Sequence, residues 1–408
     1  METGTLKKNR LMQTAQAVFL MLFAFPLLPL HWTNALFMLS AACTLTLYFM
    51  KPVPIGKIFL NNLFFILPFI PYLFEFIVTG FEPVAHFQFE KKIFFFTAPL
   101  IVPVFLKVGR FNHYKLALLI FSLSVCLLGL YAFSVLILKG MPFSADAYKN
   151  GSYLLRHEFE KLTHLHSTVF SAYALAASVF LFMFPAKRKT WQWILRILAV
   201  FMCLSALYLA VRIAFITAFV LGLIFIINAD LTLQRKIILS VFLIIAMSAL
   251  AFITPSINSR LSEFAGIKGS TTDNFNTISQ RKTITSCSWQ VFTMYMFSGT
   301  GCSHFQEELN ACYESKGWSE GAENNFNPHN QYILMGINYG ILILITFLLC
   351  LFMIFRKIIR LHEGRYFVVI ILLFFMTESL LEKQMGVYFF GLLSLLMYNV
   401  TTETVENQ

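Results

Sequence analysis

Charged side chains are scarce in this sequence. Asp, Glu, Lys and Arg make up 12% of its 408 residues, which is about half of their share in ordinary soluble domains. This scarcity excludes a cytosolic globular enzyme, a disordered chain and a nucleic-acid-binding module that folds in water. Hydrophobic residues reach 58% and include 47 Phe, so the composition predicts an all-helical, polytopic membrane protein.

Motifs of nucleotide and metal chemistry are also absent. The sequence has no Walker A loop, no G-x-G-x-x-G after a strand, no G-x-S-x-G and no H-E-x-x-H. Its seven Cys form neither a C-x-x-C pair nor a Cys/His cluster at metal-ligand spacing. We therefore expect chemistry without a metal, a cofactor or a nucleotide.

Long apolar runs alternate with short polar connections along the chain. A membrane helix needs about 20 apolar residues, and on that basis the sequence predicts about twelve spans in one integral membrane domain over residues 1–408. The run from residue 11 to 50 has no signal-peptide cleavage site, so we expect it to remain as two spans. The predicted spans lie near residues 11–29, 33–50, 58–79, 90–106, 114–138, 164–184, 191–208, 211–228, 237–254, 331–355, 366–380 and 384–401.

Basic residues concentrate in the connections on one side of these spans. The positive-inside rule places that side, with both termini, in the cytoplasm. This topology accounts for the net charge of +11 without a nucleic-acid partner. Two connections on the outer side are long, residues 139–163 and residues 255–328. Because the second is large enough for structure outside the membrane, we expect it to contribute to an active site.

Several candidate functional residues are charged and lie at the outer ends of spans or in the long outer loop. Arg212 has no acidic neighbour in the sequence, and its planar guanidinium suits phosphate oxygens; contact with lipid headgroups is the alternative. Arg281 and Lys282 lie in the long outer loop, where a solvated surface pair is the alternative. Glu75 and Arg196 lie within predicted spans, and we expect both to reach the nearest interface.

Two histidines begin spans on the same outer side. His329 and Asn330 occur in NPHN, where a polar loop turns into a helix. A neutral imidazole at that position can act as a base, with a capping or interfacial histidine as the alternative. His166 begins another span, and Glu378 lies in the outer turn between the last two spans. Polar side chains from distant segments are thus expected at one membrane face.

From about residue 164 to the C-terminus, the sequence resembles the O-antigen ligase and O-antigen polymerase superfamily of bacterial membrane glycosyltransferases. In that pattern one Arg opens a span, a second Arg precedes a G-x-G turn in the periplasmic loop, and H-N-x-Y-L opens the next span. Arg212 matches the first part, although Val211 replaces a Ser, and Arg281 precedes Gly299 of GTG. The residues that match the third part are His329, Asn330, Tyr332 and Gly340.

The resemblance implies a metal-independent enzyme of the bacterial inner membrane with a periplasmic active site. Its donor would be a glycan linked to undecaprenyl diphosphate, bound among membrane lipids with its polyprenyl tail in an apolar groove, and its acceptor a hydroxyl of lipid A core. Arg212 and Arg281 would stabilise the leaving diphosphate, and His329 would be the base, with inversion at the sugar. The residues expected to bind donor or acceptor are Arg212, Arg281, Lys282, His166, Asn330 and Glu378.

Three other functions stay open at this point. A polymerase of the same superfamily would use a lipid-linked repeat unit as its acceptor, and a related transferase would glycosylate protein. A flippase or transporter for lipid-linked sugars belongs to a different class. The sequence places its charges at the outer mouth of the spans and shows no internal repeat, which favours catalysis over transport.

Three Cys lie in the long outer loop, on the oxidising side of the predicted membrane. This placement predicts a disulfide there. We expect the pair Cys302 and Cys312, which are ten residues apart, with Cys287 as the alternative partner.

Overall fold

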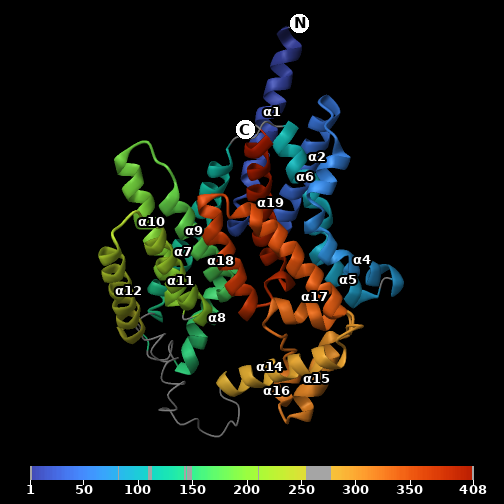
Figure 1. Ribbon diagram of the computed structural model, residues 1–408, viewed down its shortest axis with the longest axis vertical. Coiled ribbons are helices and arrows are strands. Elements are labelled where there is room, and N and C mark those ends of the chain that lie inside the picture. Colours follow the sequence, from blue (N-terminus) through green and yellow to red (C-terminus); the bar gives the residue numbers. More distant parts are fainter. Residues whose placement is uncertain are drawn as a thin grey trace. The chain divides into compact units, whose positions relative to one another are not determined.

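The computed structural model of the protein describes residues 2–80, 82–108, 113–141, 144, 149–209, 211–253 and 277–406. Every regular element in these ranges is a helix, and none is a strand (Figure 1). The all-helical prediction is confirmed for this part of the chain. The predicted loop 255–328 up to residue 276, and residues 142, 143 and 145–148 of the loop 139–163, lie outside the described residues.

Helices occupy all twelve segments that the sequence predicts as spans. In chain order the elements are α1 (Glu2–Leu22), η1 (Phe25–Leu27), α2 (Leu30–Met50), α3 (Ile55–Asn61), η2 (Leu63–Phe65), η3 (Leu67–Phe69), α4 (Ile70–Val78), α5 (Pro83–Lys92), α6 (Phe94–Val108), α7 (Tyr114–Leu138), α8 (Lys149–Thr163), α9 (Ser167–Met183), α10 (Lys189–Tyr208), α11 (Arg212–Asn228), α12 (Leu233–Ile253), α14 (Thr277–Met294), α15 (Phe305–Ser315), α16 (Ser319–Glu323), α17 (Gln331–Ile358), α18 (His362–Thr377), η6 (Leu380–Glu382) and α19 (Gln384–Glu406).

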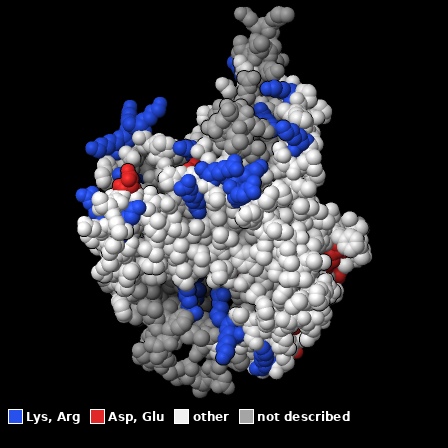
Figure 2. Space-filling view, viewed as in Figure 1, with Lys and Arg blue, Asp and Glu red and all other residues white. Residues whose placement is uncertain are grey.

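Five of the described helices, α2, α7, α10, α12 and α17, are long and apolar enough to cross a membrane. The number rises to seven if two bent helix pairs each form one span, with bends of 53° and 72°. In the first bent pair the break lies at Asn62, between Ile55–Asn61 and Leu63–Val78. Charged side chains are sparse on the face of the molecule that Figure 2 shows. These features are those of a helical membrane protein.

The helices form two compact units. Unit 1 comprises Met1–Ser124, Lys282–Val368 and Glu378–Gln408, and unit 2 comprises Val125–Arg281 and Val369–Thr377. Helix α6 packs against α2 and α19 within unit 1, where the ring of Phe95 stacks on Phe69 at 3.9 Å.

Helices α9 and α10 pack along each other in unit 2. Four alanines of α9 are fully or almost fully buried, and such small side chains let two helices approach closely. They are Ala172, Ala174, Ala176 and Ala177. The hydroxyl of Ser178 donates across the contact to the carbonyl oxygen of Ala199 at 2.8 Å.

Helix α17 is interrupted at Gly340, where φ is 77° and ψ is −178°. The loop of residues 296–301, called the glycine loop below, fills this break. The backbone N–H of Ile341 donates to the carbonyl of Met296 at 2.7 Å. The carbonyl of Ile337, which a regular helix would pair with Ile341, accepts from the N–H of Thr300 at 2.9 Å. The loop therefore supplies hydrogen-bond partners that the helix loses at its break.

Glycine is required on both sides of this contact. Gly299 and Gly340 have φ values of 69° and 77°, in the left-handed region that favours glycine. A Cβ on Gly299 would overlap the carbonyl of Asn338, and one on Gly340 would lie 2.8 Å from the carbonyl of Met296. The two glycines that match the family pattern are therefore parts of one packing contact.

Glu75 at the end of α4 holds the glycine loop from the other side. Its carboxylate accepts hydrogen bonds from the backbone N–H groups of Cys302 and Ser303, at 2.8 and 3.0 Å, and from the Ser303 hydroxyl at 2.6 Å. The hydroxyl of Tyr339 donates a fourth bond at 2.9 Å. These four donors bind the Glu75 carboxylate within unit 1, and the expectation that Glu75 reaches the interface stays a prediction.

A disulfide joins Cys287 of α14 to Cys312 of α15, with their Cα atoms 5.7 Å apart. The predicted pair Cys302 and Cys312 is therefore wrong. Cys302 is a buried thiol, and its backbone N–H is bound to Glu75. Cys287 lies on the buried side of α14, which places its sulfur against α15.

Mass mapping of the non-reduced protein should find Cys287 linked to Cys312 and should find Cys302 alkylated only after unfolding. The variant Cys312→Ser should lower the free energy of unfolding by about 3 kcal/mol, because it opens a loop of 25 residues in the unfolded chain. Thermal unfolding in detergent measures this loss, with Cys43→Ser as the control outside the loop. A linked peptide that contains Cys302 would contradict the assignment.

Replacing Gly299 by Ala should destabilise the protein by about 2 kcal/mol or more, because a Cβ there meets both a left-handed backbone and the carbonyl of Asn338. The matched control is Gly56→Ala in α3, where no atom lies within 4 Å of the new Cβ and the helix gains about 0.4–1 kcal/mol. Thermal unfolding of both variants in the same detergent checks the difference. Equal melting temperatures would show that the glycine loop does not need its tight contact with α17.

Candidate active site

The NPHN segment forms the start of α17. The side-chain oxygen of Asn327 accepts from the backbone N–H of His329 at 2.9 Å, and His329 adopts a left-handed backbone with φ 48°. Asn330 caps the helix, since its side-chain oxygen accepts from the N–H of Ile333 at 3.0 Å. The predicted helix start is confirmed. The two asparagines fix the backbone on either side of His329, so the imidazole is presented from an ordered turn.

His329 forms a pair with Glu378, which lies in the turn after α18. The Nδ1 atom of the imidazole is 3.3 Å from the carboxylate Oε2, and the two side chains are 19% and 10% exposed. On one flank the ring of Phe326 lies 6.3 Å from the imidazole and itself stacks on Trp318 at 5.3 Å. Two residues that are 49 positions apart in the sequence are thus brought together in unit 1.

The turn that carries Glu378 is bound to two other elements of unit 1. The backbone N–H of Leu381 donates to the side-chain oxygen of Gln331 at 2.8 Å, and the ammonium of Lys92 donates to the carbonyl of Leu381. Lys92 is fully buried and also pairs with Glu382 at 3.0 Å, while the ammonium of Lys91 lies 4.0 Å from the other oxygen of Glu382. These contacts fix the turn, and with it the position of Glu378.

The electrostatics of Glu382 fit this anchoring role. Burial raises the pKa of the Glu382 carboxyl, but the charges of Lys92 and Lys91 and hydrogen bonds from Lys92 and Gln88 outweigh burial. The net effect is a pKa below the ordinary value, so the ion pair persists at neutral pH. The sequence interpretation missed Lys92, although a lysine inside a predicted span is itself a signal of a buried partner.

The two predicted catalytic arginines lie in unit 2. Arg212 is the first residue of α11, where the preceding Val211 offers no side-chain cap. A cation at a helix N-terminus opposes the helix dipole, so the stability of α11 does not explain an arginine there. Arg281 lies on α14, and its Nη1 donates to the carbonyl of Thr377 at 3.4 Å. Thr377 immediately precedes Glu378 in the chain.

The remaining predicted binding residues have varied surroundings. His166 caps α9, with its Nδ1 accepting from the N–H of Thr168 at 3.4 Å and its Nε2 3.8 Å from Glu160. Asn330 caps α17, as described above, and Lys282 is exposed on α14. The contacts of His166 and Asn330 are those of helix capping. Within the described residues, no group of three or more His, Cys, Asp or Glu is arranged to hold a metal ion.

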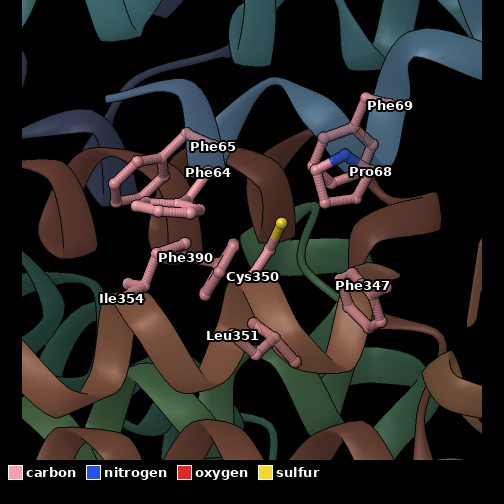
Figure 3. A pocket seen from close by; sticks show the side chains of 9 residues that line it. All are labelled: Phe64, Phe65, Pro68, Phe69, Phe347, Cys350, Leu351, Ile354 and Phe390. Carbon is pink, nitrogen blue, oxygen red and sulfur yellow. The ribbon is translucent and has the colours of Figure 1, made fainter. Parts of the chain in front are cut away.

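A small, partly open apolar pocket lies in unit 1. In Figure 3 the side chains of Phe64 and Phe65 stand on one side of the thiol of Cys350, and those of Pro68 and Phe69 stand on the other. The lining residues are Phe64, Phe65, Pro68, Phe69, Phe347, Cys350, Leu351, Ile354 and Phe390. The first lining residue on α17 is eighteen positions after His329 and lies beyond the break at Gly340. The pocket is therefore separate from the pair of His329 and Glu378.

Comparison with protein families finds one match for the central part of the chain. Residues 197–348 match the family described as O-Antigen ligase. A search of curated proteins finds no match. The matched segment contains Arg212, Arg281 and His329 as well as the glycine loop and the break at Gly340. This segment is therefore similar to the O-antigen ligase family, and the match supports the superfamily that the sequence motifs predicted.

Proposed function

We propose that the protein is an O-antigen ligase-like glycosyltransferase with about twelve membrane spans and both termini in the cytoplasm. It transfers a glycan from undecaprenyl diphosphate to a hydroxyl of lipid A core, at the periplasmic face of the bacterial inner membrane. The family match supports the donor and acceptor classes. The observation that carries the proposal is the pair of His329 and Glu378 at the start of α17, inside an ordered turn.

His329 is the proposed general base. The Glu378 carboxylate accepts a hydrogen bond from Nδ1–H, which fixes the imidazole tautomer and leaves the lone pair of Nε2 for the substrate. Nε2 removes the proton from the acceptor hydroxyl while its oxygen attacks the anomeric carbon of the donor sugar. The bond from that carbon to the diphosphate breaks, and attack from the opposite face inverts the anomeric centre. Glu378 is thus a positioning residue for the base.

Arg212 and Arg281 are the proposed partners of the diphosphate, with Lys282 as an additional cation. Negative charge grows on the diphosphate as its bond to the sugar breaks. A guanidinium held in place stabilises that charge more in the transition state than in the bound donor, which lowers the barrier. The unfavourable position of Arg212 at the start of α11 supports this role, because the helix itself gains nothing from the charge.

The proposed role of His329 as general base predicts how much different variants lower kcat for transfer. His329→Ala should lower kcat for transfer by roughly 10² to 10⁴, with protein abundance and donor binding unchanged. Glu378→Gln should lower kcat less, because Nε2 keeps its place but loses its preferred tautomer. The matched controls are His304→Ala and Glu307→Gln, which disrupt an exposed His–Glu pair at the same 3.3 Å spacing. Retained transfer by His329→Ala would remove the general-base role.

Glycan profiling of a deletion strain assigns the acceptor. If lipid A core stays bare while full-length polymer accumulates on the polyprenyl carrier, and only the wild-type gene reverses this, the protein is a ligase. Single repeat units attached to the core would identify a polymerase instead. Bare lipid A core with the lipid-linked donor retained on the cytoplasmic side would identify a flippase, and the catalytic roles above would fail.

The diphosphate site predicts a separate result for the arginines. Arg212→Lys and Arg281→Lys keep the charge but lose the forked geometry, so each should lower kcat by about tenfold or more, and the Gln variants by roughly 10² to 10³. Arg196→Lys is the control, because the Arg196 guanidinium lies 5.5 Å from the rings of Phe182 and Trp193. Single-turnover transfer with purified donor measures the rates. Equal rates for the Gln variants and wild type would overturn the diphosphate assignment.

A further inference from the structure

Helix α14 has one buried face and one exposed face. The buried side chains, at helical spacing, are Ile284, Cys287, Ser288, Val291 and Phe292. The exposed side chains that follow Lys282 along the other face are Thr285, Ser286, Trp289, Gln290 and Thr293. The buried face accounts for the packing of the helix, so the exposed residues are not needed to hold it in place.

Trp289 is the unusual member of the exposed face. Its side chain is 57% exposed, whereas tryptophan is on average a highly buried residue. The ring of Phe292 lies 5.6 Å from the indole and supports it from the buried side. The disulfide at Cys287 and a hydrogen bond of 2.6 Å from Lys316 to the Ser286 hydroxyl hold this part of α14 to its neighbours. The indole is therefore a rigid aromatic surface that faces outward.

The side chains around Trp289 indicate the chemistry of its partner. Apart from Phe292 and the exposed Met294 at the end of the helix, the exposed residues next to Trp289 on α14 carry hydroxyl and amide groups, and an acyl chain would bury these groups without hydrogen bonds. No acidic residue occurs in α14. Lys282 is seven residues before Trp289, so both lie on the same side of the helix about 10 Å apart. A partner must therefore offer apolar C–H surface, many hydroxyl groups and neutral or negative charge.

We propose that this face of α14 binds the glycan part of the lipid-linked substrate, with Trp289 as the platform on which a sugar ring stacks. The C–H face of a pyranose packs on the indole, and its hydroxyl groups bond with Ser286, Gln290 and Thr293. The proposal rests on the proposed function, because Lys282 is a candidate partner of the diphosphate to which the glycan is joined. The glycan then extends along α14, away from that cation.

Tryptophan fluorescence tests this site directly on the full-length protein in detergent. The probe is polysaccharide released by mild acid from the lipopolysaccharide of the producing strain. Its addition should change the emission of the wild type and of Trp191→Phe, a control whose indole is 55% exposed on α10. The change should be lost in Trp289→Phe. An emission change that survives in Trp289→Phe would overturn the proposal.

Transfer kinetics give a second readout that a folding defect does not imitate. Trp289→Ala should raise KM for the lipid-linked glycan about tenfold, the equivalent of 1.4 kcal/mol, with kcat within about twofold. Trp289→Phe, which keeps an aromatic face, should restore most of the affinity. If the wild type transfers glycan and Trp289→Ala has an unchanged KM, the glycan site on α14 is overturned and the proposed function stands. If wild type transfers no glycan but polysaccharide still changes Trp289 emission, the proposed function fails and the glycan site stands.

Two other occupants of the face have distinct signatures. Brominated lipids in nanodiscs quench a tryptophan that contacts acyl chains, so strong quenching that Trp289→Phe abolishes would assign the face to the membrane and overturn the proposal. A change of oligomeric state in Trp289→Ala, measured by light scattering, would assign the face to a second copy of the chain and also overturn it.

Discussion

The break in α17 at Gly340 is the constraint on which the architecture of unit 1 depends. A helix in a membrane cannot leave its backbone groups without partners, and the glycine loop supplies those partners through Met296 and Thr300. Glu75 then binds the two residues just beyond the loop, with two hydrogen bonds from backbone N–H groups and one from the Ser303 hydroxyl. The N-terminal part of α17, which follows His329, is thus defined by contacts outside its own helix.

A second set of contacts fixes the partner of His329. The turn between α18 and α19 is bound through Gln331 on one side and through the buried Lys92 on the other. Breaking a buried ion pair leaves an uncompensated charge, which typically costs about 3–5 kcal/mol. The pair of Lys92 and Glu382 is therefore a costly feature to place in a membrane protein, and its effect is to hold Glu378 at its distance from the imidazole.

Local features of the fold were predictable, and long-range pairings were not. Apolar run length located the helices in the predicted spans, because the thickness of a bilayer sets the length of a span, but it did not indicate α8, α14, α15 and α16. The NPHN segment located the start of α17 from capping chemistry alone. In contrast, Glu75 binds a loop 227 residues away and Lys92 binds a turn 289 residues away. Helical periodicity carries no information at such separations, and for the same reason the spacing of three cysteines predicted the wrong disulfide.

The chain segments before and after the small lobe formed by α15 and α16 are both held in place by hydrogen bonds. Its first residues are held by Glu75, and its last residues are held by the bond between Asn327 and the backbone of His329. Because both ends of the lobe are fixed whatever its length, insertions and deletions within the lobe would leave His329 in place. The lobe is thus a region where natural variation in length can be accommodated without moving His329.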